Sequence, residues 1–233
     1  LCDEAIADNR YFAEAYDIQA MTYQATGEQE QAFSSIQIAA EIAPYSMARQ
    51  YLLIEIARKL NNVPLQVQAS KQLYEITRRS IKQDIVHLLN YIRTVIDAAV
   101  RTDDPNQRNR YLQEVSLALQ RVKRDEGMTR EIDFGLFEAL CQARLESLSG
   151  AQYQAKKTYA AVADQLSEQH QVLPDAIFLL NQIGEFEQAQ SLTQLVPAEL
   201  MKNPLLKTLF SDQQHFVDKK QQQFGELNKA GIK

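Results

Sequence analysis

A tight turn recurs along this chain at a regular spacing. Three six-residue segments begin with glycine and end with alanine: GEQEQA at 27–32, GAQYQA at 150–155 and GEFEQA at 184–189. Gly150 and Gly184 are 34 residues apart, and Asn61 lies 34 residues after Gly27. Asparagine is the residue that best replaces glycine where the backbone needs a positive φ. We therefore predict that Gly27, Asn61, Gly150 and Gly184 each follow the end of a helix in a left-handed turn.

The sequence on each side of the first turn is typical of two packed helices. Apolar residues recur at helical intervals in FAEAYDIQAMTYQAT before Gly27 and in EQAFSSIQIAAEIAP after it, where Pro44 stops the helix. Small residues are needed where two helices approach closely. The small residues that we assign to such contacts are Ala20, Ala32, Ala143, Ala155 and Ala189. Each unit is a helical hairpin, and its remaining apolar surface needs a neighbouring hairpin to cover it.

A 34-residue hairpin with a small residue seven before the turn and alanine five after it resembles the tetratricopeptide repeat. The resemblance is clearest over 13–44 and 136–197, is degenerate over 47–130, and includes a truncated repeat from about 226. It implies an all-α superhelix of antiparallel helical hairpins. We therefore expect one helical repeat domain over 1–233.

Some positions depart from the repeat pattern. In the second repeat Ile54 and Gln66 replace the small residues, and in the last clear repeat Ile177 does so. Between the repeats, residues 81–101 have helical spacing, and Asp103-Asp104-Pro105 predicts a helix stop followed by a capped start with proline at the first helical position.

Three segments resemble the tetratricopeptide half of bacterial response regulators: LCDEAIADNRYFAEAYDIQAMTYQATGEQEQA, APYSMARQYLLIEIARKLNN and ELNKAGI. In that family a phosphoacceptor receiver domain precedes the repeats. The resemblance implies a cytoplasmic output module of two-component signalling, whose docking to a protein changes when a receiver upstream of Leu1 is phosphorylated. Two alternatives stay open: a free-standing adaptor or chaperone-like scaffold without phospho-control, and a regulatory domain of an enzyme or transcription regulator that lies outside this chain.

In a stacked array the first helices of the hairpins line a concave groove, where we expect a protein or peptide partner to bind. The residues mapped to this groove are Asp17, Met21, Gln24, Tyr51, Glu55, Arg58, Leu140, Arg144, Phe178 and Asn181. The alternative for each is packing against its neighbours. Tyr, Phe and Arg are the residue types that carry most binding energy at interfaces. Co-chaperone repeats that clamp a C-terminal carboxylate use Lys and Asn here, where this chain has Asp17 and Met21, so we expect no such clamp.

Charge and composition argue against several classes of protein. The net charge of −5 and a pI of about 5.3 lack the basic character of a nucleic-acid binder, so we predict no nucleic-acid partner. No apolar stretch is long enough to span a membrane. The two cysteines, Cys2 and Cys141, are far fewer than a secreted disulfide scaffold uses, which favours a reducing compartment.

No pattern of catalytic, metal-binding or cofactor-binding residues is found. The three histidines, His87, His170 and His215, have no second ligand at a metal-like spacing, and no glycine-rich phosphate loop occurs. We expect neither enzyme activity nor a metal or cofactor. The degenerate region 47–130 is our candidate for a homodimer interface, and a solution mass near 26.6 kDa would argue against it.

Overall fold

The computed structural model describes residues 1–78, 85–123 and 134–218, except 205, 208, 212 and 216. Within these residues the regular secondary structure is helical and no strand occurs, which confirms the all-α prediction. The α-helices are α1 (Cys2–Asp8), α2 (Ala13–Thr26), α3 (Gln29–Ile42), α4 (Met47–Lys59), α5 (Val63–Arg78), α6 (Ile85–Arg101), α7 (Pro105–Lys123), α8 (Phe134–Leu148), α9 (Gln152–Val162), α10 (Leu173–Ile183) and α11 (Phe186–Thr193). Short 3-10 helices are η2 (Ala163–Glu168), η3 (His170–Val172) and η4 (Leu200–Lys202).

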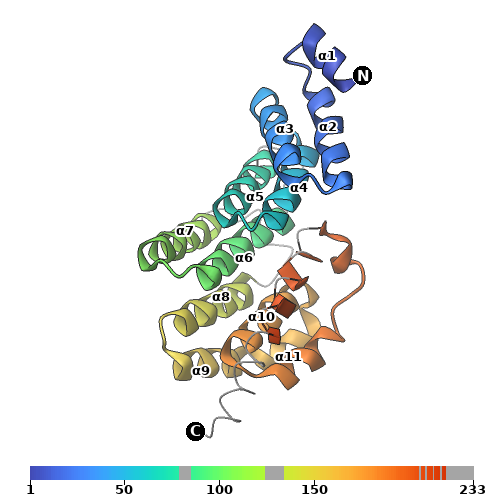
Figure 1. Ribbon diagram of the computed structural model, residues 1–233. Helices are drawn as coiled ribbons and strands as arrows, with labels where there is room; N and C mark the ends of the chain where they lie inside the picture. The colour runs from blue at the N-terminus through green and yellow to red at the C-terminus, as the bar shows by residue number, and fades with distance from the viewer. Residues whose placement is uncertain are drawn as a thin grey trace, which may run out of the picture. The chain divides into compact units, whose positions relative to one another are not determined.

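The chain divides into two compact units, Leu1–Ala98 (unit 1) and Ala99–Lys233 (unit 2). In unit 1, α2 packs against α3 and α4 packs against α5 (Figure 1). In unit 2, α8 packs against α9 and α10 packs against α11. Each unit therefore contains at least two helical hairpins among the residues that the structure describes, while a single repeat domain over 1–233 stays a prediction.

The four predicted turns share one backbone geometry. The φ angles are +86° at Gly27, +52° at Asn61, +87° at Gly150 and +85° at Gly184. The Gly27 N–H donates to the carbonyl of Gln24, three residues back, and the next N–H donates to the carbonyl five residues before it. The same two bonds recur at the other three turns. This is the Schellman ending of a helix, and it confirms the left-handed turns predicted from spacing alone.

Gly150→Ala is expected to lower the free energy of unfolding by about 1 kcal/mol, because an L-residue pays this cost in the left-handed region. A Cβ added at Gly150 would meet no atom within 4 Å, so the cost comes from the backbone alone. Gly150→Asn should cost less, since Asn61 already occupies the equivalent turn. Urea unfolding of both variants provides the measurement, and equal losses for Ala and Asn would contradict this account.

Two further helix boundaries agree with the sequence. Helix α3 ends at Ile42, two residues before Pro44, as predicted. Helix α7 begins at Pro105, and the Asp104 carboxylate accepts a hydrogen bond from the N–H of Asn106 at 2.9 Å. Asp104 is thus an N-cap that satisfies a backbone donor left without a helical partner.

The small residues of the hairpins are buried, as close helix packing requires. Exposed fractions are 0% for Ala20, Ala32, Ala143 and Ala155 and 2% for Ala189. In the degenerate second hairpin Gln66 is also buried, and its amide donates to the carbonyl of Ala57 at 3.4 Å. The larger side chain is therefore accommodated with its polar end paired.

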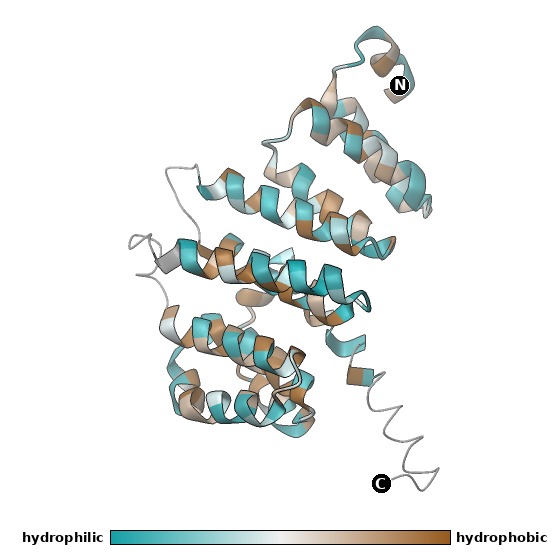
Figure 2. Ribbon diagram, turned by 90° about the vertical axis from the view of Figure 1, so that its left-hand side faces the viewer, coloured by the Kyte–Doolittle hydropathy of each residue, from teal (hydrophilic) through white to brown (hydrophobic). Residues whose placement is uncertain are grey.

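Hydrophobic and hydrophilic residues are mixed along the helices in Figure 2. Unit 1 buries Ile36, Ile56 and Leu73, and unit 2 buries Phe137 and Leu180, all exposed by 1% or less. This is the pattern of helices that are covered on one side. The truncated repeat predicted from about 226 lies outside the described residues, as do parts of the degenerate region 47–130.

Candidate functional site

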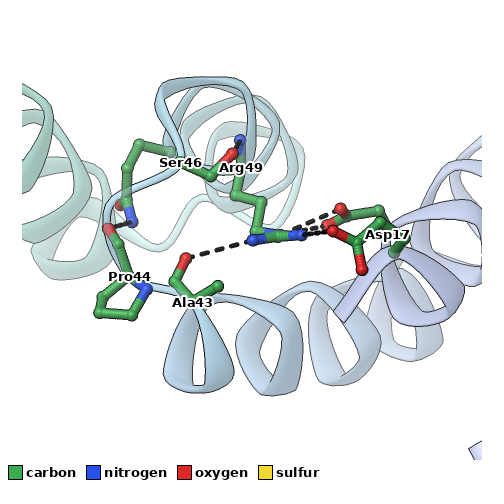
Figure 3. A network of polar contacts seen from close by, with 7 residues as sticks. Asp17, Ala43, Pro44, Ser46 and Arg49 are labelled. Atoms are coloured by element: carbon green, nitrogen blue, oxygen red, sulfur yellow. Dashed lines mark hydrogen bonds and ion pairs between the residues drawn. The ribbon is translucent and has the colours of Figure 1, made fainter. Parts of the chain in front are cut away.

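Helices α2 and α4 are joined by a buried arginine (Figure 3). Arg49, which is 7% exposed, donates from Nε to both carboxylate oxygens of Asp17, at 2.8 and 3.0 Å. Its other nitrogens reach Glu14 at 3.4 Å and the Ala43 carbonyl at 3.3 Å. The Ser46 hydroxyl accepts from the Arg49 N–H at 3.4 Å and caps α4. The side chain thus connects both helices and the link between them.

The pKa of Arg49 is raised, chiefly because its side chain donates to the Asp17 carboxylate. Burial opposes this shift, while the negative charges of Asp17 and Glu14 add to it. A raised pKa means that folding favours the charged guanidinium. The Asp17 side chain was assigned to the groove from sequence, and in the structure it is one-quarter exposed and paired with Arg49.

The groove positions predicted in unit 1 lie on two helices, and we call them together the α2–α4 face: Asp17, Met21, Gln24, Tyr51, Glu55 and Arg58. Met21 is 58% exposed, whereas Gln24, Tyr51 and Arg58 are half-buried. The exposed Glu55 pairs with Lys59 at 3.3 Å. The Tyr51 hydroxyl lies 3.3 Å from Nδ1 of the buried His87. This face therefore offers apolar, aromatic and charged groups at the surface.

In unit 2 three predicted groove residues are buried instead. Leu140 and Arg144 are 0% exposed and Phe178 is 1% exposed, while Asn181 is half-buried. The Arg144 guanidinium lies 5.3 Å from the centre of the Phe178 ring, which is a cation–π contact. A partner cannot reach these three side chains in this conformation, so their assignment as open groove residues is corrected to the core of unit 2.

Phe178 is covered by a segment that the sequence did not place against α10. The described residues between 204 and 218 are helical, and Leu206 and Leu209 join a core cluster with Ile177 and Phe178. The Phe210 ring meets that of Phe178 edge-on, with centroids 5.1 Å apart. The chain's own residues thus cover the face of α10 where a partner was expected.

A surface pocket of about 350 Å³ opens between α2 and α3 of unit 1. Its lining residues are Gln19, Tyr23, Glu30, Gln31, Ser34, Ser35 and Ile38. The Ser35 hydroxyl donates to the Gln19 amide oxygen at 2.8 Å, and the Gln19 amide nitrogen donates to Asp3 at 2.9 Å. These bonds fix the inner end of the pocket and join it to α1.

Neither the role of Arg49 nor this pocket could be recognised from the sequence. Asp17 and Arg49 are 32 residues apart, so no local spacing connects them. The repeat spacing places Asp17 and Arg49 in the first helices of successive hairpins. That spacing does not predict that the two side chains form an ion pair. The pocket residues are ordinary polar and apolar side chains that have no motif.

Across the described ranges, no three or more His, Cys, Asp and Glu side chains gather closely enough to hold a metal ion. None of the helices in these ranges combines the length and the apolar run needed to cross a membrane. Comparison of the chain with protein-family models, with curated proteins and with solved structures found no match.

Proposed function

We propose that this chain is a non-enzymatic protein-interaction domain, in which tetratricopeptide-like hairpins stack as a superhelix. The observation that supports this most directly is the same Schellman turn at Gly27, Asn61, Gly150 and Gly184. In stacked hairpins of this kind the first helices line one extended concave binding surface. The α2–α4 face, with its exposed Met21, is the part of that surface which the partner contacts.

The finer proposal is that the domain is the output module of a cytoplasmic bacterial receiver–tetratricopeptide response regulator. It rests on the resemblance of the opening and link segments, and the hairpins of unit 1 are consistent with it. It requires that phosphorylation of a receiver in the full-length protein changes how strongly the partner is captured. Equal capture with and without phosphorylation would leave a constitutive scaffold.

The α2–α4 face predicts where a photo-crosslinker captures a partner. A benzophenone amino acid placed at Met21 in the full-length protein should crosslink a discrete partner in cells. The same group at Tyr153 of α9, which is 82% exposed, is the matched control and should not. With the partner purified, Met21→Ala should cost more than about 1 kcal/mol of binding free energy, as truncation of a true anchor does.

Two results would overturn this assignment. One is the same crosslinked species, in equal yield, from Met21 and Tyr153. The other is an unchanged affinity after Met21→Ala, measured by calorimetry on a variant whose helical content equals that of the original chain. Because Met21 is more than half exposed, its truncation should not disturb folding.

A further inference from the structure

The pocket between α2 and α3 has chemistry that the α2–α4 face does not use. Its lining includes the aromatic side chain of Tyr23 and the apolar side chain of Ile38, which is 39% exposed. The exposed Glu30 adds a carboxylate to the lining, together with the side chains of Gln31 and Ser34. The pocket therefore combines one negative charge with an apolar surface.

Two polar groups of this pocket are available to a ligand. Among the described residues, neither the Glu30 carboxylate nor the Tyr23 hydroxyl makes a hydrogen bond or ion pair. The inner Ser35 and Gln19 side chains, in contrast, are already bonded to each other. The Glu30 carboxylate and the Tyr23 hydroxyl are thus the groups left for an incoming donor.

The net charge of residues 1–46 favours a ligand of positive charge. Residues 1–46 contain eight Asp and Glu against one Arg, a net charge of −7. Residues 47–233 contain 24 Lys and Arg against 22 Asp and Glu, a net charge of +2. The net negative charge of the protein therefore lies in residues 1–46, which form α1, α2, α3 and their connections. A field of one sign steers oppositely charged partners towards it.

The same side of α2 already accepts a helix. Helix α1 packs on α2, with Asp3 bonded to Gln19 at one end of the pocket lining. Tyr23 lies one helical turn further along α2 and remains half-buried, with Ile38 exposed nearby in the lining. A segment with an apolar side chain would cover these two residues and continue the packing that α1 begins.

We propose that this pocket binds a basic segment of a partner protein in which lysine or arginine is flanked by apolar residues. The cation pairs with the Glu30 carboxylate and lies over the face of the Tyr23 ring, and the apolar neighbour packs on Ile38. An exposed ion pair alone contributes little, so the apolar contact and the field of residues 1–46 supply most of the affinity. This site is distinct from the α2–α4 face, which crosslinking at Met21 tests separately.

The test uses the intact chain and a fluorescent helix-forming peptide of leucine and lysine, with a leucine–glutamate peptide of the same length as its counterpart. We expect the lysine peptide to bind and the glutamate peptide not to bind, by anisotropy. Ser34→Trp, which fills the pocket at an exposed position without changing charge, should weaken binding by about tenfold or more, because it displaces the apolar contact. Circular dichroism checks that this variant keeps its helices.

A pair of charge-matched variants separates the pocket from the general field. Glu30→Gln should weaken binding by about two- to fivefold, the range for an exposed ion pair. Glu41→Gln removes the same charge from the same helix, outside the pocket lining, and should have a smaller effect. Two results would show that the peptide binds to the acidic surface in general and not to the pocket. One is unchanged binding after Ser34→Trp, and the other is an equal loss of binding with Glu30→Gln and Glu41→Gln. Binding of the glutamate peptide, or no binding of either peptide, would also overturn the proposal.

Discussion

Phe178→Ala is expected to lower the free energy of unfolding by about 3–5 kcal/mol, the usual cost of truncating a buried phenylalanine. The ring is 1% exposed, and its centre lies 5.3 Å from the Arg144 guanidinium and 5.1 Å from the centre of the Phe210 ring. Its loss leaves a cavity in the cluster where residues between 204 and 218 pack on α10. Urea-induced unfolding followed by circular dichroism provides the measurement.

Tyr153→Ala is the matched control, because it removes an aromatic ring of similar size from an 82% exposed position on α9. Its effect on stability should stay within about 0.5 kcal/mol. If Phe178 were an open groove anchor, its truncation would resemble this control in stability and would act on partner binding instead. A loss below about 1 kcal/mol for Phe178→Ala would therefore return the residue to the groove.

The sequence was sufficient for those features that depend on local backbone chemistry. Gly27, Asn61 and Gly150 could be placed in left-handed turns because few residues tolerate a positive φ, and their spacing repeated. The start of α7 followed from Asp104 and Pro105 for a similar reason, since a side-chain cap and a missing N–H both act within one turn. Such signals require no knowledge of what packs against the helix.

The environment of each groove position could not be predicted in the same way. Met21 and Phe178 were assigned to the groove by one mapping, yet Met21 is 58% exposed and Phe178 is buried. The mapping gives the direction of a side chain from its own hairpin, but burial depends on segments distant in sequence. For Phe178 the covering residues include Leu206 and Phe210, whose sequence had no repeat signal to place them.

This difference locates the proposed function within the chain. In unit 2 the mapped positions Leu140, Arg144 and Phe178 stabilise the core, while in unit 1 the mapped positions reach the surface. Residues 1–46, which precede α4, also carry the net negative charge of the chain, −7 against +2 for residues 47–233. Both proposed binding sites, the α2–α4 face and the α2–α3 pocket, therefore lie in unit 1. Helix α2 contributes to each of them: Met21 belongs to the α2–α4 face, and Tyr23 lines the pocket.

Arg49→Met is expected to lower the free energy of unfolding by about 2 kcal/mol. The change keeps an apolar stem but removes the charge-assisted hydrogen bonds to Asp17, whose carboxylate is then left one-quarter exposed without its partner. The raised pKa of Arg49 gives the sign of the pH dependence. Stability from the charged guanidinium is fully present below its ordinary pKa and is lost only as the pH rises through the higher folded value, so moderate alkali should not weaken the pair.

A double-mutant cycle separates the pair from the loss of packing. The coupling energy between Arg49→Met and Asp17→Ala should be about 1–2 kcal/mol, because the guanidinium is buried and contacts both carboxylate oxygens. The matched cycle with Glu14→Ala should give less than about 0.5 kcal/mol, since the Glu14 side chain is 65% exposed and 3.4 Å away. Equal coupling in the two cycles would mean that Arg49 acts through the general charge of the hairpin. The Asp17 contact would then not be what holds α2 to α4.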